Sequence, residues 1–237
     1  AAVVGAAPPR SFNLAPLSAR HFCSGHVYWL QQRATPGECA SVHTTFTEGG
    51  YDGKIWRFRE AALWLMDPPE YFSGRFLTFT PPQPPATLPP ARNASAPTLK
   101  NDKYNAGWLV PDALRMSPRL RAHLELVRRH VLATRDAMAL AAALKRTLVL
   151  PRYPCLCDRS EGPNIIETCT YEGSDLTLPF VCPLSHIFDL YRFRELGARA
   201  GRLAAARQPP PRLDIQLREH AFLTNPLRPP AAPDTAA

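Results

Sequence analysis

Clustered prolines constrain this chain more than any other feature of its sequence. The chain has 27 prolines among 237 residues, and seven of them fall between Pro81 and Pro97. Proline fixes the backbone φ angle and has no amide hydrogen, so this segment can form neither a helix interior nor a central strand. We therefore expect residues 81–117 to be an exposed connector or insertion, and residues 226–237, of similar composition, to be a disordered tail.

Two longer parts remain, at residues 12–80 and 118–225. The chain is 45% hydrophobic and 20% charged, which excludes disorder throughout. Residues 1–11 show little pattern, and we expect a disordered start. No apolar run reaches the roughly 18 residues of a membrane-spanning helix, and the start has neither an initiator Met nor a signal-peptide pattern. The sequence is therefore expected to be a soluble fragment of a longer protein.

The part after the connector has the clearest periodicity. Apolar and polar residues alternate over 120–126, which predicts a strand, and apolar residues recur at helical spacing over 132–144. The apolar run at 147–150 is typical of a buried parallel strand. These patterns predict an α/β fold with a β-α-β unit over about 120–150. The alternative is a single helix from Arg119 to Lys145.

Two further strands are expected outside this unit. Residues 75–80 alternate as a half-buried strand does, and residues 213–217 are expected to add a last strand to the same sheet.

The charge of the chain favours anionic partners. Lys and Arg exceed Asp and Glu by 28 to 20, a net charge of +8, and most of the cations are Arg, which binds phosphate and carboxylate in a bidentate manner. The Arg residues are scattered and no nucleic-acid-binding pattern is present, so nucleic acid is not expected as a partner.

The densest group of polar residues lies between positions 42 and 60. His43 could ligate a divalent metal, because a neutral imidazole is a common metal ligand. Lys54 follows a glycine-rich segment, and Arg57 and Arg59 add two cations that suit a diphosphate. The group outlines a nucleotide-sugar site. The alternative is a core histidine beside a solvated basic loop, since no phosphate-loop or dinucleotide glycine pattern is present.

Six strings occur in an order that resembles a known family. They resemble the carboxy-terminal half of plant-type extensin arabinosyltransferases of glycosyltransferase family 77. The likeness covers residues 12–80 and 119–226 and is interrupted by the Pro-rich connector. The strings are Phe22-Cys23-Ser24-Gly25-His26, Val42-His43-Thr44-Thr45-Phe46, Asp67-Pro68-Pro69-Glu70-Tyr71, Arg146-Thr147-Leu148-Val149-Leu150-Pro151, Cys182-Pro183-Leu184-Ser185-His186-Ile187-Phe188 and Arg218-Glu219-His220-Ala221-Phe222-Leu223-Thr224-Asn225-Pro226.

The resemblance implies a glycosyltransferase of the Golgi lumen. Such an enzyme moves arabinofuranose, or another pentose, from a UDP-sugar donor to hydroxyproline-linked arabinosides of cell-wall glycoproteins. It would be a type II membrane protein whose anchor is absent from this chain. The fold implied is the closing part of a GT-A-like nucleotide-diphospho-sugar transferase domain, followed by the connector and a smaller α/β region.

The resemblance also implies a bound Mn²⁺ or Mg²⁺ and roles for particular residues. The family carries its Asp-x-Asp metal motif in the amino-terminal half, and no Asp-x-Asp occurs in this chain, which alone is expected to be inactive. By similarity, His43 would complete the metal shell and Lys54 would meet the diphosphate. His26 would help bind the donor, and Arg57 and Arg59 would face phosphate, acceptor or Glu60.

Two departures from the family put a catalytic role for the nearby segment in doubt. Ser185 stands where relatives usually have Asp, and Ser160 stands where an aromatic residue is common.

The six cysteines have two interpretations. Asn93 begins a glycosylation sequon, and together with a Golgi lumen this favours disulfides among Cys155, Cys157, Cys169 and Cys182, with Cys23 and Cys39 as a further pair. The alternative is a zinc site that adds His186, but the spacings lack a paired Cys-x-x-Cys motif. The sequence does not fix the connectivity.

A second hypothesis belongs to another functional class. A chain without a metal motif could be a non-catalytic glycoprotein- or glycan-binding module that grips its ligand through arginines and aromatic rings, namely Tyr28, Trp29, Trp56 and Trp64.

Overall fold

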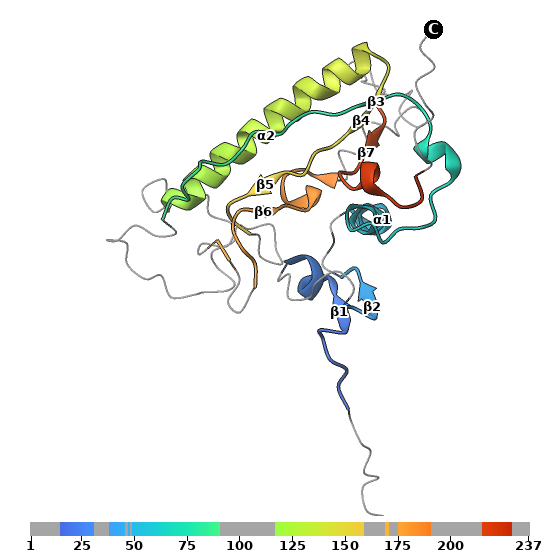
Figure 1. Cartoon of the computed structure of the whole chain (residues 1–237). Helices are drawn as coiled ribbons and strands as arrows, with labels where there is room; N and C mark the ends of the chain where they lie inside the picture. Colours follow the sequence, from blue (N-terminus) through green and yellow to red (C-terminus); the bar gives the residue numbers. More distant parts are fainter. Residues whose placement is uncertain are drawn as a thin grey trace, which may run out of the picture.

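A computed structural model describes residues 15–30, 38–45, 47, 49–90, 117–158, 169–170, 175–190 and 215–228. These residues form three small sheets, two α-helices and several short 3-10 or π-helical segments (Figure 1). The predicted disordered start and most of the connector and tail lie outside the described residues. No described helix combines the length and the apolar character needed to cross a membrane.

The long helix α2 spans Pro118–Ala143 and has well-defined ends. The Ser117 hydroxyl accepts a hydrogen bond from the amide of Leu120 at 3.1 Å, and Pro118 occupies the first helical position, where its missing amide hydrogen costs nothing. After the helix, Lys145 adopts a left-handed conformation with φ 51°. The amides of Lys145 and Arg146 then close the last turn onto carbonyls inside the helix, as in a Schellman motif.

The predicted strand at 120–126 is wrong, because these residues belong to α2, and the alternative of one helix from Arg119 to Lys145 is confirmed to within two residues at its end. The alternation of apolar and polar residues over 120–126 does not mark a strand, because the buried face of α2 includes polar side chains such as His123. The amide of Leu156 donates to His123 Nδ1 at 3.2 Å. The buried residues recur at helical spacing: Leu120, His123, Leu126, His130, Thr134, Ala137, Met138 and Ala141.

A three-stranded parallel sheet packs against α2. It consists of β3 (Phe76–Leu77), β4 (Thr147–Val149) and β7 (Leu217–Arg218) in that order. The predicted strand at 75–80 is confirmed only at Phe76–Leu77, and the one at 147–150 at Thr147–Val149. Of the strand predicted at 213–217, residues 213 and 214 lie outside the described part, 215 and 216 are not in a strand, and only Leu217 is confirmed, where β7 begins. A β-α-β unit therefore exists, but its first strand is β3, which precedes the connector.

One apolar core joins α2, the sheet and the first helix. Leu148 of β4 and Ala141 of α2 are fully buried in it, and Trp56 of the helix α1 (Gly50–Glu60) packs against its side. Its buried members are Ala137, Met138, Ala141, Leu148, Leu150, Tyr153, Leu184, Leu190 and Ile215.

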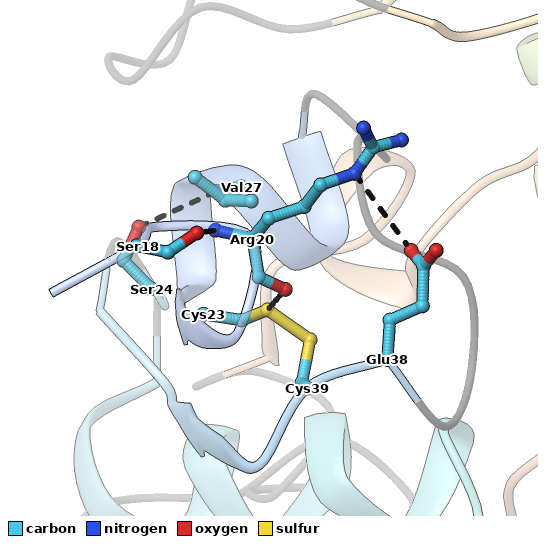
Figure 2. Close-up of a disulfide and its surroundings, with 7 residues drawn as sticks. All are labelled: Ser18, Arg20, Cys23, Ser24, Val27, Glu38 and Cys39. Carbon is cyan, nitrogen blue, oxygen red and sulfur yellow. Dashed lines mark hydrogen bonds and ion pairs between the residues drawn. A yellow bond between two sulfur atoms is a disulfide. The ribbon is translucent and has the colours of Figure 1, made fainter.

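A second parallel sheet pairs β1 (Phe22–Ser24) with β2 (Ser41–His43). Figure 2 shows the disulfide between Cys23 in β1 and Cys39, two residues before β2. This pair matches the prediction. The disulfide fixes the start of both strands relative to each other.

The other two disulfides lie around a third, antiparallel sheet of β5 (Pro154–Cys155) and β6 (Phe180–Val181). Cys155 is bonded to Cys182, and Cys157 to Cys169. The predicted disulfides are therefore confirmed. The zinc alternative is wrong, because all four thiols are used and no group that could hold a metal occurs among the described residues.

The described part of the Pro-rich connector lies along α2 (Figure 1). Residues 81–90 form neither helix nor strand. The carbonyl of Pro90 accepts from the Arg119 amide at 3.2 Å, the carbonyl of Pro89 from Arg119 Nε at 3.0 Å, and the carbonyl of Gln83 from Arg129 Nη2 at 3.1 Å. Backbone carbonyls thus hold this segment to the helix.

A buried polar group, here called the Tyr71 cluster, links α1 to β7. Its members are Arg59, Asp67, Tyr71, Arg218 and Glu219. The Tyr71 hydroxyl donates to Glu219 Oε2 at 2.5 Å, and the guanidinium groups of Arg59 and Arg218 lie 4.4 and 4.0 Å from the centroid of the Tyr71 ring. Arg59 also forms an ion pair with Asp67.

Replacing Ala139 with Pro should destabilise the protein if α2 is continuous. Ala139 is exposed, so the effect reports the lost hydrogen bond and the backbone clash, about 3 kcal/mol or more. Ala139→Gly is the matched control and should cost about 1 kcal/mol. The free energy of unfolding would be measured by urea denaturation. Equal stability of the two variants would contradict a continuous helix.

Replacing Tyr71 with Phe should also destabilise the fold. The variant leaves the buried carboxyl group of Glu219 without its donor, at a cost of about 1–3 kcal/mol. Tyr51→Phe removes a hydroxyl from a side chain that is 72% exposed and serves as the control. Chemical denaturation would compare them, and an unchanged midpoint for Tyr71→Phe would show that this hydrogen bond contributes nothing to stability.

Candidate functional site

The carboxyl ends of β1 and β2 bring together two of the predicted site residues. Ser24, the last residue of β1, pairs with His43, the last residue of β2. The chain leaves β1 through Gly25 and His26, which begins the π-helical segment η1 (His26–Leu30). Carboxyl ends of adjacent parallel strands form one edge, which is where ligands bind in open α/β sheets. His26 and His43 therefore lie at the same edge, where His26 is half-buried and His43 is exposed.

Position 25 at this edge requires glycine, because the backbone of Thr45 approaches it closely. A Cβ atom at Gly25 would collide with the carbonyl oxygen of Thr45. The amide of Gly25 also donates to the Thr45 hydroxyl at 3.0 Å. Contact between the string Phe22–His26 and the string Val42–Phe46 thus explains why Gly25 stands in the first and Thr45 in the second.

The helix α1 begins five residues after Thr45 and has a glycine-rich start whose amides suit an anion. Gly49 and Gly50 have φ angles of 90° and 60°, which L side chains rarely adopt. Gly49 provides no side-chain cap, so no side chain at this position competes for the first amides of the helix. Lys54 is exposed on α1. Amides at a helix start together with a lysine suit phosphate.

Arg57 does not lie with Lys54 on the exposed side. It is 3% exposed, and its Nη2 donates to the Ser185 hydroxyl at 2.7 Å. Its guanidinium also lies 5.7 Å from the ring centroid of Trp29 in η1. Arg57 therefore joins α1 to η1 and to the 3-10 segment η3 (Leu184–His186).

Arg59 likewise contacts other side chains of this chain, in the Tyr71 cluster. Its Nε donates to both carboxylate oxygens of Asp67, at 3.1 and 3.0 Å. The side chains of Arg57 and Arg59 are thus engaged by other residues of this chain, whereas His43 and Lys54 are exposed.

Glu60 is a buried carboxyl group that sequence reasoning treated only as a partner for arginine. Burial raises its pKa to about 7, although Arg57 and the amide of Leu184 oppose the shift. That amide donates to Glu60 Oε1 at 2.8 Å. The spacing of Gly53, Trp56, Arg57 and Glu60 could have revealed a buried helical face.

Four of the strings that carry the family resemblance make contact in pairs, and a fifth contacts α1. The strings that contain Gly25 and Thr45 form the β1–β2 edge. The string that ends in Tyr71 packs against the one that begins with Arg218, whose Nε donates to the Tyr71 carbonyl at 2.9 Å. The string that contains Ser185 holds the inner face of α1.

Four aromatic rings form a continuous series beside α1. The ring centroids of Tyr28 and Trp29 are 4.7 Å apart, those of Trp29 and Phe58 are 6.1 Å apart, and those of Phe58 and Trp64 are 6.5 Å apart. Trp56, which the binding-module hypothesis also included, packs instead against the main core.

One similar protein supports the family relationship. The chain is 32% identical to the arabinosyltransferase XEG113 of Arabidopsis thaliana over 217 residues, which cover 90% of this chain. The chain is related to the extensin arabinosyltransferases. The resemblance predicted from the six strings is thus confirmed. The match spans 28% of the length of the relative. No protein-family model matches the sequence, and no solved structure matches it with significance.

Glu60 should make stability depend on pH. Its pKa is about 7 in the folded chain and 4.5 as a free group, so the folded state holds the proton that the unfolded state releases between these values. Stability from this group is therefore lost as pH rises from about 4.5 to 7, by up to roughly 3 kcal/mol. Glu60→Gln keeps an acceptor for Leu184 and should be more stable than the parent at pH 8.

The advantage of Glu60→Gln should shrink as the pH falls toward 4.5, measured by urea unfolding across the pH range. Glu125→Gln is an informative control, because Arg128 lowers the pKa of that exposed carboxyl and the sign of the effect reverses. A Glu60→Gln difference that does not vary with pH would show that folding does not shift the pKa of Glu60.

Proposed function

We propose that this chain is part of a glycosyltransferase that moves arabinofuranose, or another pentose, from a UDP-sugar to hydroxyproline-linked arabinosides of cell-wall glycoproteins. The observation that carries the proposal is the carboxyl edge of β1 and β2, which holds His26 and His43 and from which the chain runs on to α1. The similarity to an arabinosyltransferase supports the same reaction class. A GT-A-like architecture remains part of the proposal.

The chain's own groups would act on the diphosphate of the donor. The first amides of α1 and the ammonium of Lys54 would bind its oxygens and oppose the negative charge that develops on the departing UDP. His26 would contact the donor from the other strand end. Arg57 and Arg59 would orient α1 through Ser185 and Asp67 rather than contact the donor.

The proposal includes Mn²⁺ or Mg²⁺, with His43 as one ligand. The exposed imidazole at the strand end fits a single ligand position, but no group of three or more ligand residues occurs among the described positions. The remaining ligands would come from outside the described part. When bound, the metal would supply Lewis-acid stabilisation of the diphosphate.

The disulfides support a lumenal location. The six cysteines are all paired, as is typical of an oxidising compartment such as the Golgi lumen. A type II anchor would lie in another part of the protein.

The partly exposed rings of Tyr28 and Trp64 favour the alternative function, a non-catalytic glycan-binding module, whereas Trp29 is only 7% exposed and is packed against Tyr28 and Phe58. Flat rings stack well on the apolar faces of sugars. A transferase would need the edge that holds His43 for sugar transfer, whereas a binding module would bind glycan without transferring a sugar.

The proposal predicts a loss of turnover in two variants of the full-length protein. His43→Ala and, separately, Lys54→Ala should each lower kcat for pentose transfer by about 10²- to 10³-fold, since each group opposes charge that develops in the transition state. Transfer would be measured across a manganese titration, with circular dichroism to verify folding.

His21→Ala removes an exposed histidine just before β1 and is the matched control, with normal turnover expected. Near-normal kcat and an unchanged metal requirement in folded His43→Ala would remove His43 from the site. Glycan binding without transfer by the unaltered full-length protein would favour the binding module.

A further inference from the structure

The amino edge of the three-stranded sheet places two arginines side by side. Phe76 pairs with Thr147 across β3 and β4, so Arg75 and Arg146 are the neighbouring residues just before the two strands. The amide of Thr147 donates to the carbonyl of Arg75 at 2.9 Å, which fixes this register. Both arginine side chains are exposed.

Two further cations accompany this pair. Lys145 precedes Arg146 and is exposed, in a left-handed conformation at φ 51° where glycine would be less strained. The guanidinium of Arg228 lies 5.9 Å from the ring centroid of Phe76, the residue after Arg75, and 5.5 Å from that of Phe222. We call Arg75, Lys145, Arg146 and Arg228 the amino-edge cations.

No carboxylate of the described residues forms an ion pair with any amino-edge cation. Like charges on adjacent strands repel each other. The end of α2 carries only roughly half a negative charge, which offsets a small part of four positive charges. Arg146 Nη1 donates one hydrogen bond to the Phe76 carbonyl at 3.3 Å, and the other N–H groups of Arg146 remain available to a ligand.

We propose that the amino-edge cations form a second anion-binding site, which takes a small multivalent oxyanion of the diphosphate type. A diphosphate supplies several oxygens for the forked donors of two arginines and a negative charge that relieves the repulsion between them. The site is separate from Lys54, which lies on α1 after the carboxyl edge of the other parallel sheet. It does not depend on the proposed transferase reaction.

The test is isothermal titration of the purified chain with inorganic pyrophosphate. All proteins carry Lys54→Gln, so that binding at α1 does not contribute. The Lys54→Gln chain should bind pyrophosphate, and adding Arg75→Gln with Arg146→Gln should weaken binding at least about tenfold, because two charge-assisted contacts are lost.

The matched control adds Arg128→Gln with Arg135→Gln, which removes the same net charge from exposed arginines already paired with Glu125 and Asp136. It should change the affinity less than about twofold, because unpaired cations bind added anions more readily than ion-paired ones. Absence of binding by the Lys54→Gln chain, or equal weakening by the two double substitutions, would overturn the site. Circular dichroism would verify that each variant is folded.

Discussion

Burial of one face of α2 against β4 is the contact on which the other elements depend. Ala141 and Leu148 are completely excluded from water at the centre of this contact, and Trp56 adds α1 to the same core. Because short strands of two or three residues cannot stay paired without an apolar face to pack against, the sheet needs the helix. The position of α1, and with it Lys54, follows from the same core.

Much of the second half was predictable from sequence, apart from the polar residues inside it. The apolar run at β4 and the disulfides were read correctly from local pattern and cysteine usage. The strand predicted at 120–126 was wrong because His123 faces inward, as Thr134 does further along α2. Their polar atoms are satisfied by the Leu156 amide and the Tyr153 hydroxyl, partners that hydrophobic periodicity does not reveal.

The candidate site was predictable where it depends on local chain chemistry. The glycine-rich segment before Lys54, and His43 as a candidate ligand, can be recognised without a structure, but the strands β1 and β2 that carry the edge were not predicted. The roles of Arg57 and Glu60 could not be, because their partners Ser185 and Leu184 lie more than a hundred residues away in the sequence. Within the six strings, a few positions are proposed to bind the donor or a metal. More positions make contacts between distant parts of the chain.

The hydrogen bond between the Pro90 carbonyl and the Arg119 amide has an evolutionary consequence. It brings the two ends of the intervening segment to one point at the start of α2, and Gln83 and Arg129 anchor the incoming chain further along the helix. Once both ends are fixed, the closure entropy of the segment grows only with the logarithm of its length. A longer or shorter segment should therefore have little effect on folding, so we expect its length to vary among relatives.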